Sequence, residues 1–87
     1  MSIATTSRNL PNLNRIQSMA VRVLWDEATT RNGLSRGEAL RVMRMYEPSE
    51  VDHAIRWGLH LRHLIECRRH AAGGPVETVF HSMGPRP

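Results

Sequence analysis

Two closely spaced helix starts constrain the fold of this chain more than any other feature. Ser35–Glu38 (SRGE) matches a capping box, in which serine and glutamate each accept a hydrogen bond from the other's backbone amide. Ser49–Asp52 (SEVD) repeats the pattern with aspartate in place of glutamate. Between them, Glu47-Pro48 ends the earlier helix, because a residue before proline disfavours the helical region. The pattern predicts two short helices joined by a tight turn.

A longer helix precedes this pair. Apolar residues recur at three- and four-residue steps from Asn12 or Asn14 to Asn32-Gly33, where glycine supplies a left-handed cap. The third helix is predicted from about Ser49 to His63. The predicted apolar faces are Leu13, Ile16, Ala20, Val23, Leu24 and Ala28 in the first helix, Ala39, Leu40, Val42, Met43 and Tyr46 in the second, and Val51, Ala54, Ile55, Gly58, Leu59 and Leu61 in the third.

The period changes after the third helix. Residues 65–70 and 76–83 form short β-compatible runs, and the Gly-Gly-Pro turn signal lies between them. We therefore expect a mainly α fold with a small β-hairpin: three helices and a two-stranded wing. Residues 12–83 are predicted to form one domain, between a flexible arm (1–11) and a disordered tail (84–87).

The composition excludes several classes of protein. The chain has 87 residues, enough for one domain whose core is too small for a deep catalytic cavity. We expect no enzymatic activity and no cofactor, since no glycine-rich phosphate loop is present. No run approaches the roughly 18 apolar residues of a membrane span, and the N-terminus lacks a secretory core. A single cysteine, Cys67, suits a reducing compartment, so we predict a cytoplasmic protein.

The charge favours a polyanionic partner. The net charge is +4, and all 12 basic residues are arginine. Arginine binds phosphate and guanine edges through two parallel hydrogen bonds, so an arginine-only set suits nucleic acid. Codon bias in a GC-rich genome would produce the same composition, and both explanations remain open.

The spacing of apolar residues across the second and third helices is also informative. Leu40 and Val51 are eleven positions apart, and Tyr46 stands where an apolar side chain would fill the turn. Leu59, followed by Leu64-Ile65, leads into the first predicted strand. With the order of helices, turn and hairpin, these residues resemble the winged helix-turn-helix fold of bacterial transcriptional regulators. The resemblance extends over roughly residues 16–83.

This resemblance implies a function and a set of contacts. The third helix, opened by Ser49, would enter the major groove of double-stranded DNA, and the wing would hold the backbone. The protein would then be a small transcriptional regulator that acts by occupying its site, of a kind that suits a phage or mobile element. The predicted DNA-binding residues are Arg36, Arg41, Arg44, Ser49, His53, Arg56, His60, Arg68 and Arg69.

Other interpretations of these residues remain open. The arginines could instead be solvated or paired with Glu38, Glu47 or Glu66, and for Arg36 contact and pairing are equally weighted. A winged helix can also be a protein–protein interaction module within a larger assembly, without DNA binding, or a scaffold without activity of its own. We expect no metal site, although His60, His63 and Cys67 carry ligand groups, because no fourth ligand is apparent.

An apolar surplus on the first helix suggests association. Met19, Val21 and Trp25 widen its apolar face beyond what one packed side needs. A homodimer through this helix would place two recognition helices about 34 Å apart, on successive half-sites. Alternatively, Trp25 completes the core against the C-terminal tail.

Overall fold

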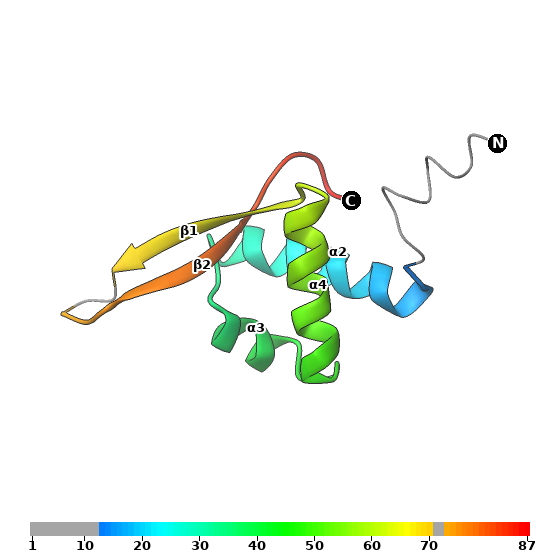
Figure 1. Cartoon of the computed structure of the whole chain (residues 1–87), viewed down its shortest axis with the longest axis horizontal. Coiled ribbons are helices and arrows are strands. Elements are labelled where there is room, and N and C mark those ends of the chain that lie inside the picture. Colours follow the sequence, from blue (N-terminus) through cyan, green and yellow to red (C-terminus); the bar gives the residue numbers. More distant parts are fainter. Residues whose placement is uncertain (1–12, 71–72) are drawn as a thin grey trace.

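A computed structural model describes residues 13–70 and 73–87, so the predicted arm (1–11) lies outside the described residues. The described part forms three helices followed by a two-stranded antiparallel hairpin (Figure 1). The predicted fold class is therefore confirmed, with a winged-helix-like layout. The elements are α2 (Arg15–Thr30), α3 (Arg36–Val42), α4 (Pro48–His60), β1 (Leu64–His70) and β2 (Val76–Ser82).

Reciprocal capping fixes the starts of α2 and α3. At α3, the Glu38 amide donates to Ser35 Oγ at 3.2 Å, and the Ser35 amide donates to Glu38 Oε1 at 2.8 Å, as the sequence predicts. At α2, Asn14 and Gln17 form the same pair of bonds at 2.8 and 2.9 Å. Each box satisfies backbone donors that the first helical turn leaves without partners.

The start of α4 differs from the prediction. Ser49 is the second helical residue and not the N-cap; the N-cap is Glu47, whose backbone is extended at φ −65° and ψ 147°. Pro48 takes the first helical position, where its missing N–H costs nothing. The Glu47 amide donates to Glu50 Oε1 at 2.9 Å. The proline that stops one helix also starts the next, so the helix begins one residue before Ser49.

The predicted C-terminal ends of the second and third helices lie later in the sequence than the ends of α3 and α4 in the structure. Helix α3 stops at Val42, and the Tyr46 amide then donates to the Met43 carbonyl at 2.9 Å, which makes a compact turn before α4. Helix α4 stops at His60, because Arg62 adopts the left-handed region at φ 64°. The His63 amide closes this end by donating to the Gly58 carbonyl at 2.8 Å.

The hairpin forms as predicted and gains an additional bridge. Its register runs from Leu64 opposite Ser82 to His70 opposite Val76. Leu34, between α2 and α3, exchanges two backbone hydrogen bonds with Phe80 at 3.1 and 2.8 Å, which attaches this linker to the outer edge of β2. In Figure 1 the distal part of the hairpin extends away from the three helices.

The core lies where α2, α3, α4 and the base of the hairpin meet. Helices α2 and α4 pack against each other, and Gly58 lets Leu64 of β1 approach the α4 backbone closely. The largest fully buried side chains come from the helices, the linkers and the hairpin: Leu24, Leu34, Met43, Val51 and Val79. Within the described residues, no helix has the length and apolar character needed to span a bilayer.

The last residues lie against α2. The Arg86 guanidinium pairs with both oxygens of Asp26 at 2.8 and 2.9 Å, and Arg22 Nε donates to the Pro87 carbonyl at 3.1 Å. These are contacts that the expected disordered tail would not make. Trp25 Nε1 donates to the Met83 carbonyl at 3.4 Å, so Trp25 packs against the tail, which is one of the two alternatives left open by the sequence.

Candidate nucleic-acid interface

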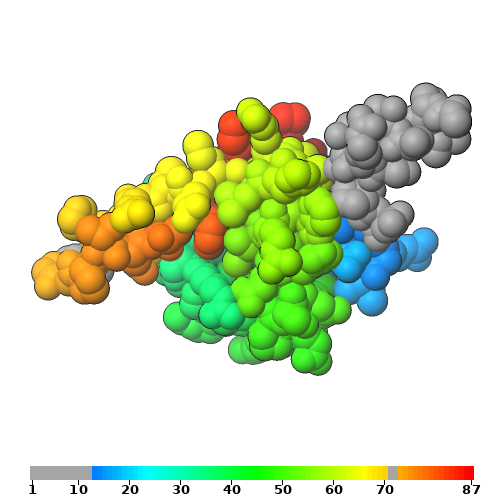
Figure 2. Space-filling model, in the orientation of Figure 1, coloured from blue at the N-terminus to red at the C-terminus, as the bar shows by residue number. Residues whose placement is uncertain are grey.

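One side of α4 faces solvent and carries polar side chains. Its core-facing residues are Val51, Ala54, Ile55 and Gly58. The opposite side, called here the α4 ridge, consists of Ser49, His53, Arg56 and His60. Ser49, Arg56 and His60 are exposed and His53 is half-buried. Figure 2 shows α4 running across the middle of the visible face, with the hairpin extending to one side. The ridge is therefore accessible along the length of α4.

A row of aromatic rings holds the ridge histidines in place. Trp57 Nε1–H donates to His53 Nε2, and the two rings meet edge-on with centroids 5.7 Å apart. The His60 ring lies on the other side of Trp57, with centroids 5.3 Å apart. Trp57 therefore holds both histidine rings in fixed positions along the ridge.

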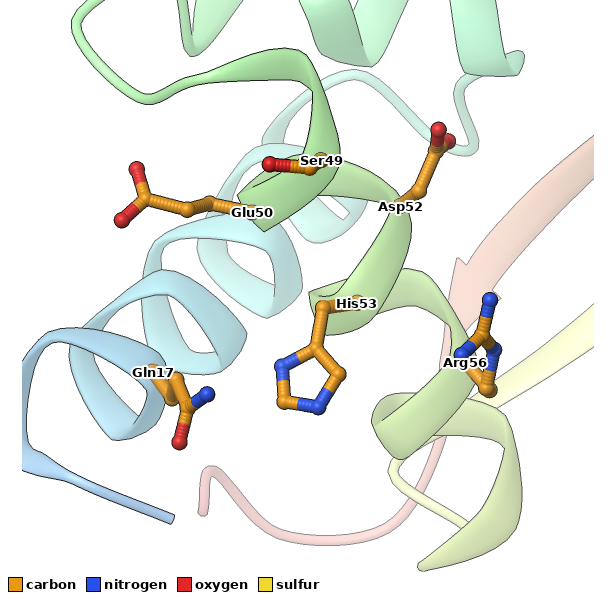
Figure 3. A pocket seen from close by; sticks show the side chains of 6 residues that line it. All are labelled: Gln17, Ser49, Glu50, Asp52, His53 and Arg56. Atoms are coloured by element: carbon orange, nitrogen blue, oxygen red, sulfur yellow. The ribbon is translucent and has the colours of Figure 1, made fainter.

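Arg56 lies at the edge of an open depression on the ridge. The depression is lined by Gln17 of α2 and by Ser49, Glu50, Asp52, His53 and Arg56 of α4 (Figure 3). Arg56 makes no hydrogen bond or ion pair with any other described residue. Its charge contributes to a lowered pKa of Asp52, below the ordinary 3.8, after the larger effect of the hydrogen bond from Arg36. The Arg56 guanidinium thus remains available to a ligand.

Arg36 connects α3 to α4. Its Nε and Nη2 donate to the two carboxylate oxygens of Asp52 at 2.6 and 2.9 Å. Of the two alternatives left open for Arg36, pairing is the one present, with a partner that the sequence analysis did not consider. The bidentate contact spans two helices and holds the first turn of α3 beside the first two turns of α4. Arg36 positions the ridge.

Arg68 and Arg69 point to opposite faces of the hairpin, because successive side chains of a strand alternate. Arg69 lies between α3 and β2: its Nη2 donates to Glu77 Oε2 at 3.0 Å and to Glu38 Oε1 at 3.2 Å. Arg68 shares a face with Leu64, the residue that packs on α4, and it is exposed. Arg68 has no ion pair within the described residues. The hairpin therefore presents one arginine on the α4 side.

Arg41 and Arg44 lie elsewhere. Both line a depression formed by the end of α2 and the end of α3, to which α4 contributes no residue. The α2 residues of the two depressions, Gln17 and Glu27, are about 15 Å apart along the helix axis at 1.5 Å per residue. Of the nine predicted contact residues, the structure brings Ser49, His53, Arg56 and His60 together on the ridge, with Arg68 on the neighbouring hairpin face.

Two further predictions concern metal and dimer contacts. Within residues 13–70 and 73–87, no three histidine, cysteine, aspartate or glutamate side chains come together as ligands. Val21 is buried in the core and Met19 is exposed, so Val21 is not available to the predicted dimer face through Met19, Val21 and Trp25, and the homodimer itself stays a prediction. The spacing of apolar residues along α2 fits more than one side of the helix. Which side α4 covers depends on how the two helices pack.

Sequence reasoning missed two residues that shape the ridge. One is Trp57, whose spacing of four from His53 and three from His60 is the signal that the rings would touch. Asp52 was assigned to a capping box and instead pairs with Arg36. Comparisons of this chain with protein-family models, with curated proteins and with solved structures find no match.

Proposed function

We propose that this protein binds double-stranded DNA, with the α4 ridge in the major groove and Arg68 on the neighbouring phosphate backbone. By occupying its site it regulates transcription. The observation that carries the proposal is the exposed Arg56 on the solvent-facing side of α4, without an ion pair among the described residues. The major groove is wide enough to admit an α-helix presented in this way.

The chemistry of the ridge suits base edges. A guanidinium donates to guanine O6 and N7 together, a contact worth about 1–3 kcal/mol of discrimination. His53 adds a ring held beside Trp57, and Ser49 offers a hydroxyl. The Arg56 guanidinium can only donate, so we expect an acceptor-rich, guanine-containing target.

The carboxylates at the start of α4 do not oppose this proposal. Asp52 is neutralised by the two hydrogen bonds from Arg36. Glu50 accepts from the Glu47 amide and points its charge at the helix start. Beyond them, Arg56 and Arg68 remain without ion pairs within the described residues, and phosphate contacts of this kind supply most non-specific affinity.

The experiment compares arginine variants in a duplex-binding assay. Arg56→Ala and Arg68→Ala together should weaken binding to a guanine-rich duplex pool at least about tenfold, measured by fluorescence anisotropy at low salt. The matched control is Arg22→Ala with Arg86→Ala, which also removes two cations but breaks only contacts between α2 and the C-terminal residues. Circular dichroism checks that each variant is folded. Equal affinity of the double variant and the parent would refute the site.

Salt separates DNA binding from the alternative of a protein-interaction module. Binding through phosphates should weaken about tenfold when the salt concentration is tripled, and Arg68→Ala should reduce the slope by about one. If no duplex is bound even at low salt, the function proposed here is wrong and the interaction module becomes the better account.

A further inference from the structure

A second basic surface lies between the C-terminal half of α2 and the end of α3. Met45 stands in it with 85% of its surface exposed, more than any other large apolar side chain among the described residues. We call this surface the α2–α3 depression. It is lined by Glu27, Arg31, Glu38, Arg41, Val42, Arg44 and Met45.

The carboxylates of the α2–α3 depression are already engaged. Glu27 accepts from Arg31 Nε at 2.9 Å. Glu38 caps α3 and accepts from Arg69 at 3.2 Å, and these contacts, the Ser35 amide first, hold its pKa below the ordinary 4.5. Arg41 and Arg44, in contrast, make no hydrogen bond or ion pair with any other described residue. Two unpaired guanidinium groups therefore flank an exposed thioether.

Another depression in the described part of the molecule also combines two arginines with a methionine and a valine, but both of its arginines have partners within the chain. It is lined by Met19, Arg22, Val23 and Arg86. There, Arg86 pairs with the Asp26 carboxylate at 2.8 Å, and Arg22 donates to the Pro87 carbonyl at 3.1 Å. In that depression the chain supplies its own carboxylate and backbone oxygen. In the α2–α3 depression the carboxylates of Glu27 and Glu38 are held by Arg31 and Arg69, and no carboxylate of the described residues pairs with Arg41 or Arg44, so an external segment that brings its own carboxylates fits it.

We propose that the α2–α3 depression docks an acidic, apolar segment of a partner protein. Carboxylates of the segment pair with Arg41 and Arg44, and an apolar side chain covers Met45 and Val42. Arginine clusters recognise acidic motifs through such charge-assisted bonds, and methionine adapts to varied apolar partners. A phosphate backbone has no apolar group to cover Met45, which favours a peptide over DNA.

The proposal is tested with a fluorescein-labelled peptide of about ten residues that alternates aspartate and leucine. Arg41→Gln with Arg44→Gln should raise its Kd at least about tenfold, and Met45→Ser about threefold. The control is Arg22→Gln with Arg86→Gln, which removes an equal number of positive charges from the depression beside Met19 and Val23. The control should change the Kd less than about twofold.

Two further measurements test whether the α2–α3 depression binds a different partner. A lysine–leucine peptide should not bind, and the Arg41/Arg44 variant should lose no more affinity for duplex DNA than the matched control. Equal binding of the lysine peptide, or equal weakening by the control, would overturn the proposal. So would a specific loss of DNA affinity in the Arg41/Arg44 variant, which would assign the depression to DNA. Concentration-dependent dimerisation removed by Met45→Ser would assign it to a second copy.

Discussion

At the scale of single residues, two helical glycines have opposite surroundings. A Cβ at Gly58 would lie 2.6 Å from Leu64 Cδ1 and 2.9 Å from its Cγ. Leu64 is buried, so its side chain would have to shift among packed neighbours. A Cβ at Gly37 would meet only Ser35 Oγ, at 3.9 Å. The absence of a side chain at Gly58 is what lets β1 cross close to α4 and sets the base of the hairpin.

We predict that Gly58→Ala lowers the free energy of unfolding by about 1–2 kcal/mol. Overpacking a filled core typically costs about 1–3 kcal/mol, and the gain in helix propensity, at most about 1 kcal/mol, offsets only part of it. Gly37→Ala is the control and should leave stability unchanged or raise it by up to about 1 kcal/mol. Urea unfolding measures both. A Gly58→Ala protein as stable as the parent would show that Leu64 does not press on α4.

Strand alternation explains what the sequence indicated about the wing arginines and what it did not. Two adjacent arginines in a hairpin were expected to act together on phosphate. Alternation instead sends Arg69 toward Glu77 and Glu38 and leaves Arg68 exposed. The strand itself was predictable from its β-compatible run. Pairing with Glu38 was one of the alternatives left open, and the sequence could not select it because it depends on how α3 packs beside the hairpin.

At the scale of elements, caps decide where the helices begin. Ser35 is an N-cap whose hydroxyl accepts from the Glu38 amide. Ser49 follows Pro48 inside α4, and the α4 start is held by Glu47 and Glu50. The two serines look alike in the sequence because each is followed three residues later by an acidic side chain. Only the proline, which occupies the first helical position, distinguishes them.

We predict unequal effects of removing these two hydroxyls. Ser35→Ala should destabilise the fold by about 1 kcal/mol, since it leaves a helix-start amide without its acceptor. Ser49→Ala should change stability by less than about 0.5 kcal/mol, as is usual for exposed positions without a capping role. Thermal or urea unfolding of both variants provides the comparison. A loss at Ser49 as large as that at Ser35 would restore Ser49 as the N-cap.

The ends of the helices and the β-bridge at Leu34 were harder to predict from the sequence. Apolar residues continue to Tyr46, so periodicity extended α3 through a stretch that is a turn. From that turn the same side chains still reach the core. Met43 is buried in it, and the partly buried Tyr46 packs against the core cluster. Leu34 carries no strand signal by itself, because its bridge needs the edge of β2 from the far end of the chain.

At the scale of the whole molecule, the predicted DNA-binding arginines that make no ion pair among the described residues divide between two surfaces. The sequence predicted one continuous DNA-binding set, since a helical wheel shows which residues of a helix face outward. It does not show how the outward sides of two helices are oriented relative to each other. The structure separates the α4 ridge and Arg68 from Arg41 and Arg44. This separation is the basis for proposing two partners, duplex DNA and an acidic segment.

The most direct test of DNA binding through α4 is an amide chemical-shift map of the protein titrated with a guanine-rich duplex at low salt. The account predicts that the largest shifts fall on the ridge residues Ser49, His53, Arg56 and His60 and on Arg68, while Arg41 and Arg44 change little. Shifts concentrated at Arg41–Met45, or no shifts at any duplex concentration, would contradict it.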